Sequence, residues 1–274
     1  MNTLLVFIFL TGLLENKRIA VIATLLFGLH PIHAEAVAWV TERKELLYAF
    51  FFLASLTCYV RFVKTGRRTW FWIAFVAFIL SLLSKATAVV LPLVLILIDQ
   101  YLDRKWLSIK LTAEKLLFII PALAFGLLTL YLHRSFGSLT NASEFSIAER
   151  LFIAGRGVMY YLSKTVWPLD LSPYNQLPGS LNTTLVIEIL FYWVLIAIAI
   201  YTIFRIRFKN RLLFFSAGFF VVTVFLFLVP PGVPVMVSER YAYIPSLGLF
   251  LIIASIFERV FVKPQPVRNT AFVI

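Results

Sequence analysis

The sequence predicts an all-α fold, a polytopic bundle of membrane helices. Of its 274 residues, 61% are apolar, and the mean hydropathy is +0.94. Soluble domains are closer to half apolar, so this excess indicates a protein embedded in a membrane. Only 14% of the residues are charged, and they cluster between apolar runs as loops do between spans. We therefore expect residues 1–274 to form a single transmembrane domain with no soluble domain.

The net charge of +12 raises the question of nucleic acid, but the sequence offers no support for that partner. It contains no basic helix and no basic sheet pattern interleaved with aromatic residues. The lone cysteine, Cys58, lies inside an apolar run and excludes a disulfide framework. No basic segment precedes the apolar residues 3–14 and no small-residue cleavage site follows them, so a cleaved signal peptide is not expected.

About eight or nine membrane helices are expected from the apolar runs. One run, 70–102, would extend about 50 Å as a single helix, against a hydrocarbon core of about 30 Å. We expect it to form a hairpin that turns at Ser84-Lys85. Lys85 would then lie at the tip with no acidic residue near it in the sequence, which indicates function. The other runs are 3–14, 19–29, 46–60, 115–132, 185–204, 212–229 and 247–261.

Residues 147–166 are predicted to form an interfacial helix. The run is apolar but carries Glu149, Arg150, Arg156 and Lys164 along its length. Interspersed charges are typical of a helix that lies in the membrane interface rather than across it.

The basic residues are distributed unequally between the two faces of this topology. Alternate loops hold 17 of the 25 Lys and Arg residues, and the other face holds 8. The positive-inside rule assigns the richer face to the cytoplasm. The polar segments inside apolar sequence then gather on the opposite face and form an outward polar cavity. The loops assigned to the cytoplasm are 15–18, 61–69, 103–115, 205–211 and 258–268.

The segment 28–45 is the most polar interruption of the apolar sequence. It begins with His30, His33 and Glu35, whose side chains could hold a divalent metal, or a phosphate if the histidines are protonated. The spacing does not specify a metal. The structural alternative is that the histidines cap a helix that starts after Pro31.

Cations on the outer face have two interpretations. Arginine is the side chain best shaped for phosphate, so Arg43, Lys44 and Arg240 could form a phosphate clamp. The alternative is simple ion pairing with the nearby acids Glu42, Glu45 and Glu239.

Other polar and aromatic residues have mainly structural interpretations. Asp99 and Asp103 precede a basic turn and are expected to pair there. Trp167, Tyr241 and Tyr243 are interpreted as interfacial anchors, because aromatic belts are the norm in membrane proteins.

Four ordered blocks of the sequence resemble a known membrane family. Gly28 to Phe52 contains HPIHAEAVAWVTERKELL, which closely resembles the family element HPxHxEAVxxxxxRxDLL. The family comprises the TPR-containing transmembrane O-mannosyltransferases and their prokaryotic relatives. The blocks at 82–99, 161–174 and 239–248 agree with it in the same order.

The resemblance implies a GT-C type glycosyltransferase fold. Such enzymes move a sugar, often mannose, from a polyprenyl-phosphate carrier to a protein or glycan acceptor on the non-cytoplasmic face. Glu35 and His33 are the catalytic candidates, and they could position acceptor, donor or a divalent metal together with His30. The residues expected to bind the lipid phosphate are Arg43, Lys85, Arg240, His30 and Glu239. No cofactor beyond the lipid-linked donor is required by the pattern.

Two departures from the family leave the enzymatic assignment open. The family's presumed catalytic acid lies in an outer loop after the first helix, whereas Met1 falls in what resembles the second helix. That acid and the C-terminal TPR array are therefore expected to be missing from this sequence. The alternatives are a transporter or flippase for a lipid-linked sugar, which should show internal repeats, and a catalytically incomplete membrane subunit. We expect a multi-pass protein of the bacterial inner membrane with its active face outward.

Overall fold

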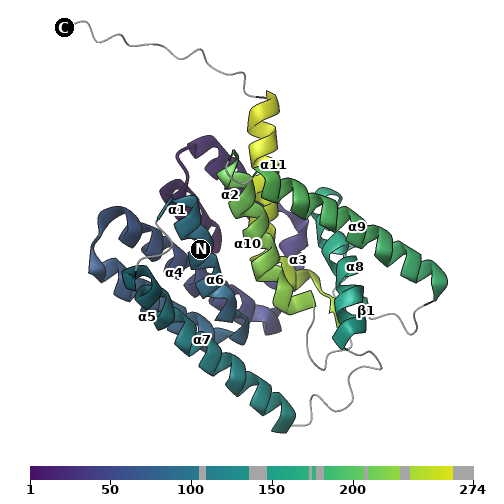
Figure 1. The fold of residues 1–274 in the computed structure, drawn as a ribbon, viewed down its shortest axis with the longest axis horizontal. Helices are drawn as coiled ribbons and strands as arrows, with labels where there is room; N and C mark the ends of the chain where they lie inside the picture. Colours follow the sequence, from purple (N-terminus) through teal and green to yellow (C-terminus); the bar gives the residue numbers. More distant parts are fainter. Residues whose placement is uncertain are drawn as a thin grey trace, which may run out of the picture.

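The computed structural model describes residues 1–104, 109–135, 147–172, 175–176, 182–206, 209–228 and 235–261. Within these ranges the chain folds into an all-α bundle, as predicted, with short 3₁₀ helices and a small antiparallel ribbon in the connections (Figure 1). The α-helices are α1 (Asn2–Leu13), α2 (Lys17–Leu29), α3 (Ala34–Ala38), α4 (Arg43–Thr65), α5 (Arg68–Ser84), α6 (Leu91–Tyr101), α7 (Ile109–Ser135), α8 (Ile147–Val166), α9 (Thr183–Ile206), α10 (Arg211–Leu228) and α11 (Ser246–Phe261). The 3₁₀ helices are η1 (Pro31–His33), η2 (Val40–Glu42), η3 (Ala86–Val90) and η4 (Glu239–Ala242), and the strands are β1 (Asn175–Gln176) and β2 (Val235–Val237).

The bundle contains helices long and apolar enough to cross a membrane. In the described part of the chain four helical segments meet both criteria, or five if the bent pair α2 and η1–α3 counts as one broken span. Three shorter apolar helices pack beside them, which brings the total among the described residues to seven or eight, against the eight or nine expected. The four long segments are Val40–Thr65, Thr112–Leu132, Thr183–Arg205 and Arg211–Leu228.

The hairpin predicted within residues 70–102 is present. Helix α5 ends at Ser84, Lys85 has an extended backbone, and η3 leads into α6. The preceding turn between α4 and α5 is made at Gly66, whose φ of 69° lies in the left-handed region that favours glycine. Both breaks therefore fall where the sequence interrupts its apolar runs.

Side-chain contacts divide the polar loops between the two ends of the bundle. At one end, Asn16 Nδ2 donates to Glu258 Oε1 at 2.9 Å. At the same end Arg211 Nη1 lies 3.3 Å from Asp103 Oδ2. The loops that the charge count groups together are thus neighbours in space, although Lys105, Arg207, Lys263 and Arg268 lie outside the described residues. The polar segments 30–45 and 238–246 meet at the opposite end.

A buried polar network fastens α7 to α4 and α6 near the basic end. Asp99 Oδ1 accepts hydrogen bonds from Tyr59 Oη at 2.8 Å and from Arg104 Nη1 at 3.1 Å. Asp99 Oδ2 lies 2.6 Å from Lys115 Nζ, and both residues are buried. The predicted pairing with the basic turn is confirmed for Asp99, which contacts Arg104, whereas Asp103 pairs instead with Arg211 at the start of α10.

Tyr59→Phe is expected to lower the free energy of unfolding by about 1–2 kcal/mol, because it removes a hydroxyl that donates to a buried carboxylate. Equilibrium unfolding in mixed detergent micelles measures the change. Tyr101→Phe on α6 is the control, since no hydrogen bond from the Tyr101 hydroxyl joins it to the described residues. Equal losses in the two variants would contradict the role given to Tyr59.

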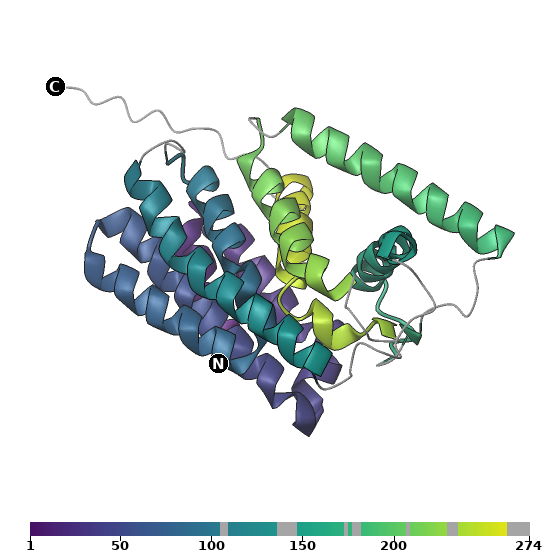
Figure 2. The same ribbon diagram turned by 60° about the horizontal axis from the view of Figure 1, so that its bottom comes forward.

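Helices α8 and α9 lie at the periphery of the bundle. Figure 2 shows α9 running along the outside, beside α8 and α10. Most of its apolar side chains are exposed, among them Ile187, Phe191 and Ile198, as expected for a helix that faces lipid. Helix α8 has the bounds predicted for the interfacial helix.

Candidate functional site: a polar wall between two apolar cavities

The segment between α2 and α4 folds into three very short helices because its sequence repeatedly interrupts helix growth. Pro31 starts η1, and His30 caps it by accepting the Ile32 N–H on Nδ1 at 3.2 Å. Trp39 has an extended backbone and ends α3 before η2 begins. The structural alternative, that the histidines cap a helix, is confirmed for His30, whereas His33 makes no capping hydrogen bond. From this segment Glu35 and Glu42 reach η4.

Charged side chains from α3, η2, α4 and η4 form a cluster that we call the polar wall. Glu35 and Arg240 lie at its centre. Arg240 Nη1 lies 2.6 Å from Glu35 Oε1, and the Arg240 backbone N–H donates to Oε2 at 2.8 Å. Ser238 Oγ lies 3.0 Å from both oxygens of the carboxylate. Since both charged side chains are nearly inaccessible, at 5% and 11% exposed, the pair is a buried one. It joins α3 to η4 across 205 residues of sequence.

Glu42 extends this network along the wall. Its Oε1 lies 3.7 Å from Arg240 Nε and 3.9 Å from Lys44 Nζ. Its other oxygen, Oε2, is buried and has no hydrogen-bond partner among the described residues. The carboxylates of Glu35, Glu42 and Glu45 therefore all lie close to a cation.

Lys85, at the turn between α5 and η3, is paired with Glu45 of α4. Its Nζ forms an ion pair with Glu45 Oε1 and lies 5.1 Å from the ring centroids of both Phe227 and Tyr241. These two rings stack at 4.6 Å. Burial lowers the pKa of the Lys85 ammonium to about 7, although the nearby Glu42 carboxylate acts to raise it.

The two histidines support the backbone rather than forming a metal site. His33 Nδ1 is 2.8 Å from Phe27 O, and its Nε2 is 2.8 Å from Ser246 Oγ. His30 Nε2 is 3.1 Å from Thr165 O on α8. In the part of the chain that the structure describes, no three His, Cys, Asp or Glu side chains group as metal ligands do. The divalent site considered for His30, His33 and Glu35 is therefore not formed.

Glu239 points away from the arginine beside it and contacts α8. Tyr160 Oη donates to Glu239 Oε1 at 3.2 Å. Burial raises the pKa of Glu239, and burial together with the Glu239 charge raises the pKa of Tyr160 to about 12. Next to it, Tyr161 Oη donates to Ser238 O at 3.0 Å. These bonds fix η4 to α8.

A first apolar cavity, of about 570 Å³, begins at Lys85. Lys85 and Tyr241 contribute to its lining together with residues of η3, α7 and α10, which are apolar except for Thr87 and Thr129. On α7 these include Leu123 and Leu127, both more than 60% exposed. The cavity is therefore bounded both by a buried cation and by the lipid-facing surface of α7.

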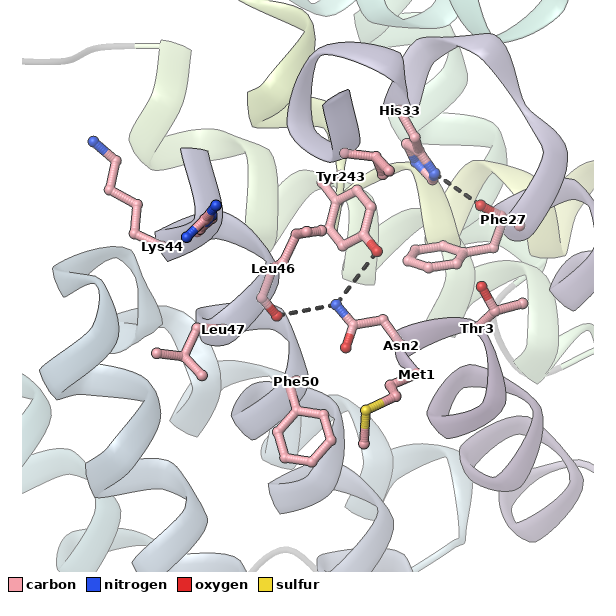
Figure 3. A pocket seen from close by; sticks show the side chains of 13 residues that line it. Met1, Asn2, Thr3, Phe27, His33, Lys44, Leu46, Leu47, Phe50 and Tyr243 are labelled. Atoms are coloured by element: carbon pink, nitrogen blue, oxygen red, sulfur yellow. Dashed lines mark hydrogen bonds between the residues drawn. The ribbon is translucent and has the colours of Figure 1, made fainter. Parts of the chain in front are cut away.

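A second apolar cavity, of about 810 Å³, lies on the other side of the wall and is shown in Figure 3. Asn2 Nδ2 donates to Leu46 O and to the Tyr243 hydroxyl across it. Arg43 is one of the residues that line this cavity. The two cavities have no lining residue in common.

The structure thus separates residues that the sequence treated as one phosphate site. Lys85 lines one cavity and Arg43 the other, and Arg240 lines neither. The prediction of interfacial anchors is wrong for Tyr241 and Tyr243, which contact Lys85 and Asn2 inside the protein. Trp167 is 69% exposed, as an anchor would be.

Sequence reasoning missed several contributors to the site. Ser238 and Phe227 were not singled out, and Glu45 was considered only as a partner for local cations. Ser238 lies next to Glu239 in a polar segment and could have been found from that position. Phe227 carried no signal, because it is one of 28 phenylalanines in the chain.

Comparisons with known proteins agree with the resemblance of the sequence blocks. Protein O-mannosyl-transferase TMTC4 of Mus musculus is 28% identical over 280 residues, which cover 84% of this chain and 37% of that protein. Protein O-mannosyl-transferase F38B6.6 of Caenorhabditis elegans is 27% identical over 255 residues, covering 88% and 35%. Protein O-mannosyl-transferase TMTC3 of Homo sapiens is 56% identical over 48 residues, 18% of this chain and 5% of that protein. No family model and no solved structure matches the chain.

The two long matches extend along most of this chain, yet the chain spans little more than a third of those relatives. The helices that can cross a membrane agree with this similarity. The chain is an integral membrane protein, a polytopic helical bundle related to the proteins named protein O-mannosyl-transferase.

Proposed function

We propose that the chain is the membrane core of a GT-C type glycosyltransferase. It moves a mannose-like sugar from a polyprenyl-phosphate carrier to a protein or glycan acceptor on the non-cytoplasmic face of a bacterial inner membrane. The sugar and the transfer reaction are suggested by the names of the relatives. The orientation is suggested by the basic loops at the end of the bundle opposite the polar wall.

The observation that carries the proposal is the cavity that begins at Lys85. A polyprenyl phosphate has an anionic head and a long apolar tail, and the cavity is lined both by a cation and by lipid-facing residues of α7. The tail would enter from the membrane between α7 and α10. The phosphate would come to lie against the Lys85 ammonium.

The proposed role of Lys85 in sugar transfer follows from the charge that develops on the leaving phosphate. As the bond between sugar and phosphate breaks, negative charge grows on the leaving phosphate, and a fixed cation in a desolvated site stabilises that state. Lys85 is the group that meets the phosphate. Arg240 is held in the wall by Glu35 and Glu42, so Glu35 acts as a positioning residue for Arg240 rather than as a base. Glu239, bonded to Tyr160, positions η4.

Lys85→Met is expected to lower the rate of sugar transfer at least 100-fold, the scale on which single electrostatic stabilisers of a transition state act. Membranes from cells that produce the chain would be given radiolabelled polyprenyl-phosphate mannose, and label in protein and glycan would be counted. Lys64→Met is the matched control. It removes an exposed cation near the C-terminal end of α4, far along that helix from Glu45, the partner of Lys85.

A second variant separates chemistry from folding. Lys85→Met alone leaves Glu45 buried and unpaired, whereas Lys85→Met with Glu45→Gln removes both charges of the ion pair. Loss of transfer in both variants supports the proposal. Absence of transfer by the unmodified chain with several lipid-linked sugars, while the donor is protected from hydrolases, would instead favour a transporter or an incomplete subunit.

A further inference from the structure

We propose that the cavity beside Arg43 is a second lipid site, one that binds a membrane phospholipid with an anionic headgroup. The phosphate lies on the Arg43 guanidinium, and an acyl chain lies along α4. This site is distinct from the cavity at Lys85, and its existence does not depend on any transfer reaction.

The charge of Arg43 is available to a ligand. Among the residues that the structure describes, none forms an ion pair or a hydrogen bond with its guanidinium. In this respect Arg43 differs from Lys85 and Arg240, which are each paired with a carboxylate. An exposed arginine can grip a phosphate with two parallel hydrogen bonds.

Three of the four neutral polar side chains that line the cavity, those of Asn2, His33 and Tyr243, are already engaged within the protein, and the fourth is Thr3. Asn2 and Tyr243 bond to each other, as Figure 3 shows, and both nitrogens of His33 contact oxygen atoms of the chain. An extended peptide needs partners for its backbone groups. The cavity therefore suits an occupant whose only strong polar requirement is an anion.

The apolar part of the cavity extends along α4 from Arg43, in the direction that the acyl chain of a lipid bound there would take. Leu47 and Phe50 follow Arg43 along α4 and line the same space. At 1.5 Å per residue, Phe50 is about 10 Å farther along the helix than Arg43. Because α4 belongs to a membrane-spanning segment that begins at Val40, Arg43 lies near the level of the headgroups. A phosphate at that level places its chains beside Leu47 and Phe50.

The dimensions agree with a ligand of this size. The volume of about 810 Å³ lies within the range of roughly 300–1,000 Å³ typical of ligand sites. Val37 and Leu47, each at least half exposed, form an apolar edge through which a lipid could enter from the bilayer.

Lipid titration with native mass spectrometry tests the proposal. Purified, delipidated protein would be titrated with phosphatidylglycerol and with phosphatidylcholine of identical acyl chains. Phosphatidylglycerol is expected to bind about tenfold more tightly. Arg43→Gln should remove this preference, while Lys64→Gln, which removes a cation from the other end of the same helix, should leave it unchanged.

Two further arms distinguish a lipid site from a site for a free phosphate. Leu47→Trp places a bulky side chain at the cavity and should weaken the binding of both lipids, and glycerol 3-phosphate should not displace phosphatidylglycerol. Equal retention of the two lipids, an unchanged preference in Arg43→Gln, or displacement by glycerol 3-phosphate would each overturn the proposal. Matching unfolding temperatures would show that the variants are folded.

Discussion

Arg240→Met is expected to lower the free energy of unfolding by about 3–5 kcal/mol, the cost of leaving a buried carboxylate without its cation. Glu35 is 5% exposed and takes its closest contact, at 2.6 Å, from the Arg240 guanidinium. Methionine fills a similar volume but offers no charge, so the carboxylate would keep only Ser238 Oγ and a backbone N–H. Equilibrium unfolding in mixed detergent micelles measures the loss.

The control for this prediction is a solvent-exposed arginine–carboxylate pair in the same protein. Arg211 and Asp103 also form a contact of 3.3 Å, but their side chains are 50% and 76% exposed. Arg211→Met is therefore expected to cost no more than about 1 kcal/mol. If the two variants lost equal stability, the polar wall would not be a buried element of the fold.

Gly248→Ala is expected to cost about 3 kcal/mol, near the upper end of the range for overpacked sites. A Cβ atom at this position would lie 2.4 Å from Ser216 O and 2.8 Å from Phe220 N. Both are backbone atoms of α10, so no side-chain rotation can make room, and α10 and α11 must separate. Small residues at helix crossings are a common device of membrane bundles. Unfolding measured under the same detergent conditions would detect the change.

Gly126→Ala provides the matched comparison, because it makes the same substitution inside a helix. No atom lies within 4 Å of a Cβ built at Gly126. Alanine favours the helix over glycine by about 1 kcal/mol, so this variant is expected to be unchanged or slightly more stable. A loss at Gly126 as large as that at Gly248 would show that helix crossing distance is not the cause.

Much of the fold was predictable from the sequence, because a membrane span has a strong local signature. Apolar runs separated by basic loops located most helices, and the excess length of 70–102 located the break at Lys85. The same loops proved to be neighbours at one end of the bundle. These features depend on short stretches of chain and on the thickness of a bilayer, both of which a sequence reveals.

The pairings within the site were less predictable, because they join distant parts of the chain. The sequence identified Lys85 as an unpartnered cation, yet its carboxylate is supplied by Glu45, 40 residues away. Tyr241 and Tyr243 were interpreted as interfacial anchors, since composition alone does not reveal which side of an aromatic residue faces lipid. Arg43 was grouped with Lys85 because both match positions of the family's motifs, and only the fold separates them into different cavities.

The distance in sequence between Glu35 and Arg240 has a consequence for biosynthesis. At 5–20 residues per second, the 205 residues between them take roughly 10–40 s to synthesise. During that interval the first polar segment is already made, while the segment 238–246 has not yet left the ribosome. That second segment supplies the ion-pair partner of Glu35 and the hydrogen-bond partners of His33 and Asn2. The contacts between the two segments of the polar wall are therefore among the last of this bundle to form.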